Sequence, residues 1–238
     1  MGRSLRERVI RPEILDTLPQ EEARRSLGDL VRLNRRWGGH STLCWLLDQA
    51  VTSPCETGDR ETFSLLDVGA ASGDMGACVR RWYPGATVTS LDYRASHLES
   101  CAAPRVVADA FGLPFREASF DYVFCSLFLH HFTDAQVVEL LRGFGVVARR
   151  AVLVIDLERH LIARNFVPWT RWVFGWDPVT VHDAAASVEA AFRPRELEAL
   201  ARSAGLQDVR ARVFRPAFRI ALIGSTETVG RPPGPRTG

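Results

Sequence analysis

The chain has 238 residues, of which 46% are hydrophobic and 24% charged, so it is long enough for one globular domain with a full core. Its net charge of +2 is too small to indicate nucleic-acid binding. All 30 basic residues are arginine, which excludes catalysis through a lysine Schiff base and phosphate loops that depend on lysine.

The first sixteen residues, MGRSLRERVIRPEILD, are charged and lack the apolar centre of a secretory signal. No run of about 18 apolar residues follows, so we expect no stable membrane anchor. The five cysteines are odd in number and form no C-x-x-C pair, which argues against a zinc or disulfide framework. These features predict a cytoplasmic protein.

The elements fall into three parts along the chain. Apolar residues recur at helical spacing from Pro19 to Gln49, and GGH at 38–40 divides them into two helices, so residues 1–61 are predicted to form an arm and a helical cap. Strands then alternate with helices over 62–225, which is typical of a mostly parallel α/β sheet covered on both faces. The last strands, after a helix at 193–205, are expected to pair antiparallel, and 226–238 is predicted to be disordered.

The stretch LLDVGAASGDMG (65–76) is a small-residue turn after a predicted strand, which lets a ligand approach the backbone. A dinucleotide fingerprint starting at Gly69 would need glycine at 71 and 74. Those positions hold Ala71 and Asp74, and an aspartate there would repel a pyrophosphate. A nicotinamide or flavin oxidoreductase is therefore disfavoured, and a P-loop is excluded because no GKS or GKT occurs.

Three acids follow successive predicted strands. Asp67 precedes the loop, Asp92 lies 23 residues after Gly69, and Asp109 ends the strand at 105–109. Each acid alone is equally well explained as a turn or helix cap. Their joint placement at the carboxyl ends of neighbouring strands favours a ligand site, because open α/β sheets bind ligands at that edge.

DVGAASGD resembles the first motif of the class I S-adenosylmethionine-dependent methyltransferases, with Ala71 in place of the middle glycine. ADAFGLPFREASFDYVFCSLFLHHF (108–132) resembles the later motifs of the same superfamily. The resemblance covers residues 63–157. It implies a Rossmann-like fold with a mostly parallel seven-stranded sheet, an N-terminal helical extension and S-adenosyl-L-methionine as the cofactor.

The resemblance also implies the cofactor contacts. The helix after the loop would receive the methionine carboxylate on its free N–H groups, and Asp67 would take the ammonium group. Asp92 would bind the ribose diol, Asp109 the adenine amino group, and the Ala71 methyl must fit against the methionine moiety or weaken binding. The expected cofactor-binding residues are Asp67, Gly69, Ala70, Gly73, Asp92, Tyr93, Asp109, Ala110, Phe111 and Ser126.

A phenolic acceptor must lose its proton, and with reference pKa values of about 10 for a phenol and about 6.5 for histidine, a histidine is the natural base. The candidates are His130 and His131, which follow the fourth strand, and His182. Adjacent residues face different ways, so one of the pair is expected to meet the substrate, and a structural or capping role is as plausible. No metal is expected, since no third ligand has suitable spacing.

Residues 158–192 are rich in aromatics. They are predicted either to pack as a hydrophobic cap or to roof an acceptor pocket with Trp169, Trp172 and Trp176, and the two roles are compatible. LNRRWGGH (33–40) is interpreted either as a helix–helix turn or as a segment that closes over the cofactor. The expected acceptor contacts are Arg35, Trp37, Asp156, Arg159, Trp169 and Trp172.

Over its whole length the chain is similar to bacterial small-molecule methyltransferases of the quinone-biosynthesis type, which are associated with polyketide-like phenols. That similarity implies methyl transfer to an aromatic hydroxyl, phenolic, quinol or polyketide-like, or to an activated ring carbon, by a monomer or homodimer. Two alternatives stay open: an RNA or protein methyltransferase, and a non-catalytic partner subunit that binds the cofactor. The first lacks an NPPY or DPPY motif, and no nucleic-acid partner is expected.

Overall fold

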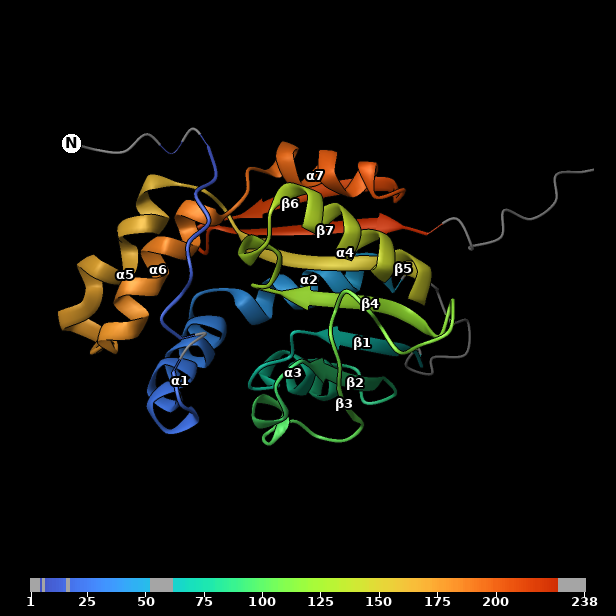
Figure 1. The fold of residues 1–238 in the computed structure, drawn as a ribbon, viewed down its shortest axis with the longest axis horizontal. Coiled ribbons are helices and arrows are strands. Elements are labelled where there is room, and N and C mark those ends of the chain that lie inside the picture. The colour runs from blue at the N-terminus through green and yellow to red at the C-terminus, as the bar shows by residue number, and fades with distance from the viewer. Residues whose placement is uncertain (1–4, 6, 16–17, 52–61, 227–238) are drawn as a thin grey trace, which may run out of the picture.

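The computed structural model describes residues 5, 7–15, 18–51 and 62–226 (Figure 1). The tail predicted to be disordered lies outside the described residues, except for Thr226. Within the described ranges, no helix is long and apolar enough to cross a membrane. The four cysteines that the structure describes, all but Cys55, are free and buried.

The centre of the fold is a seven-stranded sheet in the order β3-β2-β1-β4-β5-β7-β6, in which β7 runs antiparallel to both of its neighbours. The remaining neighbours pair parallel. This arrangement confirms the predicted mostly parallel α/β sheet and its final antiparallel strands. The strands are β1 (Ser64–Val68), β2 (Thr87–Asp92), β3 (Arg105–Val107), β4 (Phe120–Ser126), β5 (Ala148–Leu157), β6 (Gln207–Phe214) and β7 (Arg219–Ser225).

Helices connect the strands and begin at recognisable signals. Thr133 and Gln136 form a capping box at the start of α4, and Asp177 followed by Pro178 begins α6. The break predicted at 38–40 separates α1 from α2, with Gly38 at φ +88°. The helices are α1 (Gln20–Arg36), α2 (Gly39–Ala50), α3 (Asp74–Trp82), α4 (Asp134–Val147), α5 (Leu161–Phe174), α6 (Pro178–Ala190), α7 (Pro194–Ser203) and the short 3-10 helices η1 (Ala95–Leu98) and η2 (Leu129–His131).

The two faces of the sheet carry separate hydrophobic cores. β4 is buried along almost its whole length, and its sequence, FDYVFCS, is accordingly apolar apart from Asp121 and Ser126. One face packs against side chains of α4 and α7, among them Val137, Leu141, Phe144, Leu197 and Ala201. The opposite face packs against side chains of α2 and α3, among them Leu43, Leu46, Leu47, Met75 and Val79.

A third group of helices lies beyond the carboxyl ends of the parallel strands. In Figure 1, α1, α5 and α6 stand together at one end of the sheet, and the N-terminal arm runs past α6. The arm is held there by backbone hydrogen bonds, since the N–H of Val9 donates to the carbonyl of Glu189 over 3.0 Å. The aromatic stretch at 158–192 therefore contributes α5 and α6 to the edge of the sheet where its ligand is expected.

Candidate functional site

A cavity of about 840 Å³ opens at the carboxyl ends of β1, β2 and β4, between these strands and α1, α5 and α6. Its size falls in the range of about 300–1,000 Å³ that is typical of small-molecule sites. One half is bounded by the glycine loop and the turns after β2 and β3. The other half is bounded by the third group of helices.

The glycine loop, residues 69–73, needs glycine at both ends. Gly69 and Gly73 have φ values of +69° and +70°, and a Cβ at either position would come within 2.6 Å of Phe128 or Cys101. Between them Ala71 also has a left-handed backbone, with φ +44°. Alanine at this position therefore keeps the turn that glycine would make.

Asp92 ties the loop to the end of β2. Its Oδ2 accepts the backbone N–H of Ala71 over 3.1 Å, while Oδ1 accepts the backbone N–H of Arg94 and lies 3.2 Å from Nδ1 of His97. Burial alone would raise the pKa of Asp92, but the hydrogen bonds from His97, Arg94 and Ala71, together with the charge of His97, outweigh burial and lower it. Asp92 is thus an ionised carboxylate on the cavity wall at neutral pH.

The predicted cofactor residues divide into two groups. Those on the cavity wall are Gly69, Asp92, Tyr93, Asp109, Ala110 and Phe111. Behind the wall are Asp67, Ala70, Gly73 and Ser126. Asp67 is buried beneath the loop, with no hydrogen-bond partner for Oδ2 among the described residues, and burial together with the charge of Asp74 raises its pKa to about 7.

The other half of the cavity is apolar. α1 presents a stripe at helical spacing, α5 presents a second stripe, and the turn between β6 and β7 closes the space with Phe218. Trp37 packs edge-on against Phe166, with ring centroids 4.6 Å apart. The apolar lining residues from the two helices and from the C-cap of α1 are Leu27, Leu30, Leu33, Trp37, Ala163, Phe166 and Val167.

The expectation that tryptophans of the aromatic stretch roof the pocket is wrong. Trp169 and Trp172 are 69% and 83% exposed on the outer face of α5, and Trp176 is buried elsewhere. The amphipathic phase of α5 decides this, because residues 163, 166 and 167 occupy the inner face. Phe166 and Val167 form the wall in place of the tryptophans.

Three further predicted acceptor residues do not reach the cavity. Arg35 lies on the exposed face of α1. Arg159 is buried but forms an ion pair with Glu196 at 2.5 Å and donates to the carbonyl of Ala191, so it holds α7 and the arm in place. Asp156, at the end of β5, is fully buried behind the wall.

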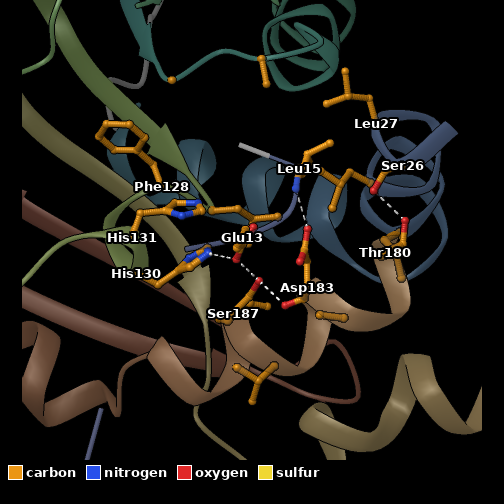
Figure 2. Close-up of a pocket in the computed structure, with 18 of the residues that line it drawn as sticks. Glu13, Leu15, Ser26, Leu27, Phe128, His130, His131, Thr180, Asp183 and Ser187 are labelled. Carbon is orange, nitrogen blue, oxygen red and sulfur yellow. Dashed lines mark hydrogen bonds and ion pairs between the residues drawn. The ribbon is translucent and has the colours of Figure 1, made fainter. Parts of the chain in front are cut away.

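Asp156 instead supports a cluster of side chains that the sequence did not predict as a unit. Its Oδ1 lies 2.7 Å from Nδ1 of His130, and Nε2 of His130 lies 3.6 Å from Oε1 of Glu13 in the arm. Figure 2 shows Glu13, His130 and His131 together on the cavity wall, with the Ser187 hydroxyl donating to Glu13. With the two histidines, Glu13 makes a set of three side chains that could bind a metal ion. Glu13 lies 117 residues before His130, so the spacing of residues in the sequence could not reveal this set.

The three predicted histidines have different surroundings. Burial opposes the charged form of His130, but Asp156 and Glu13 outweigh burial and raise its pKa to about 10. His131 is half-buried and lines the cavity, with its ring centroid 4.3 Å from that of His130. His182 is exposed on α6, hydrogen-bonded to Asp183 and away from the cavity.

Arg219, at the start of β7, is another cavity residue that sequence analysis missed. It is 5% exposed, and its Nε and Nη1 have no hydrogen-bond partner among the described residues. Its Nη2 lies 3.5 Å from Oδ1 of Asn34. Burial lowers its pKa to about 10, so it remains charged at neutral pH. The sequence signal that could have revealed Arg219 is a single arginine at the start of an otherwise apolar strand.

Comparisons with known proteins agree with this arrangement. Residues 66–155 match the family described as "Methyltransferase domain". The demethylmenaquinone methyltransferase of Roseiflexus sp. (strain RS-1) is 28% identical over 166 residues, which cover 62% of this chain and 69% of that enzyme. The chain therefore contains a methyltransferase domain and is an S-adenosylmethionine-dependent methyltransferase.

Solved structures show the same fold for this methyltransferase. Human N-acetylserotonin methyltransferase in complex with S-adenosylmethionine has a TM-score of 0.62 at 17% identity, covering 89% of this chain and 61% of that one. Magnesium protoporphyrin IX methyltransferase from Synechocystis PCC 6803, also with S-adenosylmethionine, has a TM-score of 0.56 at 13% identity, covering 87% and 90%. The chain thus spans only about three fifths of the length of the human enzyme. S-adenosyl-L-methionine is the cofactor, as predicted.

The start of α3 in this methyltransferase is held by a polar network. Oδ2 of Asp74 lies 3.2 Å from Nε2 of His40 and accepts the side-chain N–H of Asn34 over 3.0 Å, which joins α1, α2 and α3 behind the cofactor loop. The hydrogen bond to Asp74, with a smaller contribution from Cys78, raises the pKa of His40 to about 9. His40 is therefore a cation at neutral pH.

This network makes stability depend on pH. Since the folded pKa of His40 is raised, its stabilising effect is fully present below the unfolded value of about 6.5 and is lost as pH rises through about 9. We expect His40→Gln to lower the Tm near pH 6 and the difference from wild type to shrink toward pH 10, measured by thermal unfolding. In an Asp74→Asn background the same substitution should have little pH-dependent effect, and an unchanged difference across the range would contradict the assignment.

Proposed function

We propose that this enzyme methylates a small aromatic acceptor, at a phenolic, quinol or polyketide-like hydroxyl or at an activated ring carbon. One observation carries the proposal: a single cavity joins the polar cofactor wall to an apolar chamber, with His131 on its wall. An apolar chamber with few polar groups is suited to a flat aromatic ring whose one hydroxyl is directed to that histidine.

The cofactor is proposed to lie along the polar half. Asp92 binds the ribose diol, since its carboxylate has acceptor sites beyond those used by Ala71 and Arg94. Asp109, Ala110 and Phe111 border the adenine. The sulfonium methyl then faces the chamber.

Arg219 is proposed to bind the carboxylate of the methionine moiety. A buried guanidinium with two unpaired nitrogens is costly unless an anion pairs with it. The charges of Asp156 and Asp74 act on Arg219, and Asn34 lies beside it, so it lies close to the start of α3. S-adenosylmethionine has one carboxylate, and this is the group that Arg219 would hold.

The chemistry needs orientation, exclusion of water and removal of one proton. The sulfonium methyl is already electrophilic, so the chamber's task is to align the acceptor oxygen in line with the methyl–sulfur bond. His130 is protonated at neutral pH between Asp156 and Glu13 and is a poor base. His131 is the histidine that we propose to accept the phenolic proton.

The relatives support an aromatic acceptor. The name of the Roseiflexus enzyme says that it methylates demethylmenaquinone, a quinone, and the reduced quinol form of a quinone is aromatic. An RNA or protein substrate is less well matched, because the net charge is only +2 and the chamber walls are apolar. The cavity joins the polar wall proposed to bind the cofactor to a chamber for an acceptor. A site for both reactants favours an enzyme over a non-catalytic partner subunit.

Asp92→Ala should weaken the binding of S-adenosylmethionine by more than about tenfold, because a hydrogen bond to a charged group contributes about 1.5–3 kcal/mol and the ribose diol makes two of them. Asp109→Ala, at an exposed position on the same wall, should weaken binding less. Isothermal titration calorimetry with S-adenosylmethionine and its demethylated product measures both. Equal affinities for wild type and Asp92→Ala would exclude the ribose assignment.

Arg219→Gln should lower the affinity for S-adenosylmethionine by about tenfold or more, while the Tm of the ligand-free protein stays the same or rises. The rise is expected because a neutral amide costs less to bury than an unpaired guanidinium. The matched control is Arg210→Gln, on the exposed edge strand β6, which should alter neither value. A lower ligand-free Tm with unchanged affinity would instead assign Arg219 a structural role.

A screen of radiolabelled methyl transfer to alkylated phenols, quinols and transfer RNA tests the acceptor class. We expect methylation of the phenols or quinols alone. His131→Ala should lower turnover by about 10²–10⁴-fold without changing cofactor affinity, and His182→Ala should leave turnover unchanged. Methylation of transfer RNA, or full turnover by His131→Ala, would contradict the proposal.

A further inference from the structure

We propose that Glu13, His130 and His131 form a binding site for one divalent transition-metal ion on the cavity wall that faces the acceptor chamber. The site itself rests on the geometry of these three side chains. Only its role toward the acceptor rests on the proposed function.

The three side chains are already close to ligating positions. One ligand atom from each, a carboxylate oxygen of Glu13 and a ring nitrogen of each histidine, lies within 4.8 Å of the other two. Oε1 of Glu13 and Nε2 of His130 are 3.6 Å apart. Two atoms bound to one metal at about 2.0–2.2 Å are separated by at most about 4.4 Å, so small side-chain rotations suffice to complete the site.

Further hydrogen bonds orient the ligands, as is usual at metal centres. Asp156 accepts from Nδ1 of His130 over 2.7 Å, and its other oxygen accepts the backbone N–H of His130 over 3.2 Å. This directs Nε2 of His130 toward Glu13 and the cavity. Ser187 donates its hydroxyl to Glu13 and orients the carboxylate (Figure 2). A carboxylate that holds the far nitrogen of a ligating imidazole is the common supporting arrangement.

The ligand types indicate the class of ion. Two imidazole nitrogens and one carboxylate oxygen suit Zn²⁺, Fe²⁺, Co²⁺ or Mn²⁺, whereas Ca²⁺ and Mg²⁺ prefer sites made of oxygens. Three protein ligands beside a cavity leave coordination positions open to a small molecule, which is typical of catalytic sites. The open positions would face the apolar chamber.

Binding of such an ion would release the proton from Nε2 of His130, and His131 would then be a ligand and no longer the base. In that state the ion would activate the acceptor directly, in place of the base. A phenol whose oxygen binds the metal loses its proton to water, and the oxygen keeps the bonding electron pair as a metal-bound phenolate. That oxygen then forms a bond to the methyl carbon while the carbon–sulfur bond breaks. The electron pair of the carbon–sulfur bond goes to sulfur, which gives the demethylated cofactor. Acceptors with a second oxygen next to the hydroxyl would chelate the ion and be favoured.

Glu13 also links the site to the N-terminal arm. Asp183 of α6 accepts the backbone N–H groups of Ile14 and Leu15 over 3.0 and 2.9 Å, so the arm is held directly after the ligand (Figure 2). A metal bound by Glu13 and the two histidines would join the arm to the end of β4. Because the ion would bind only the folded state, it should raise the Tm, and the increase should grow with the logarithm of its affinity.

The test uses the full chain, freed of metal with a chelator, and titrated with Co²⁺ by visible absorption and with Zn²⁺ by calorimetry. We expect one ion per chain and a higher Tm. Glu13→Gln and His131→Gln should each weaken binding by more than about tenfold, and Asp156→Asn by about 10–100-fold through its effect on His130. The matched control, His182→Asn, removes a histidine that lies outside the cavity and should leave metal affinity unchanged.

Two results would overturn the site: no Co²⁺ absorption and no Zn²⁺ heat with wild-type protein, or an equal loss of affinity in His182→Asn and Glu13→Gln. Binding of S-adenosylmethionine by each variant shows that the protein is folded. If Glu13→Gln fails to fold, the half-buried His131 provides the decisive variant. Methyl transfer that persists in full after chelation would overturn the activating role, whereas metal binding without methylation of any phenol would contradict the proposed function alone.

Discussion

The parallel pairing of β1 with both β2 and β4 is the constraint on which the rest of the structure depends. It brings the carboxyl ends of three strands to one edge, so the glycine loop after β1, Asp92 at the end of β2 and η2 after β4 become neighbours. Beyond the carboxyl ends of these strands the chain turns away from the sheet, which leaves a crevice that the side chains of the sheet do not fill. The third group of helices covers this crevice and encloses it as a cavity.

Buried charge is concentrated around that cavity. Asp67, Asp92, Asp156, His130 and Arg219 are each less than a tenth exposed, which is rare for ionisable side chains unless they are paired or bind a ligand. Two of them keep unpaired polar atoms in the described structure, Oδ2 of Asp67 and two nitrogens of Arg219. Polar groups that weaken the fold at this edge are best explained by what they do for a bound ligand.

The same cavity explains why the N-terminal arm belongs to the site. The arm has no regular secondary structure over residues 7–13 and makes its contacts through the side chains of Arg8 and Glu13 and the backbone groups of Val9, Ile14 and Leu15. Its hydrogen bonds and ion pairs reach α6, the start of α4 and, through Glu13, His130 of η2 after β4. The arm therefore connects the aromatic stretch to the sheet across the acceptor chamber.

The sequence by itself determined the alternating strands and helices, the glycine loop and the acids at strand ends, because period, turn residues and strand order are local properties. Asp92 and Asp109 could be placed on the cavity wall from such signals. Tertiary structure alone decided that Phe166 faces inward while Trp169 and Trp172 face outward. The composition of a helix does not determine which of its faces packs against its neighbours. It also decided the meeting of Glu13 with His130 and the burial of Arg219, because contacts between residues more than a hundred positions apart depend on how the whole chain packs.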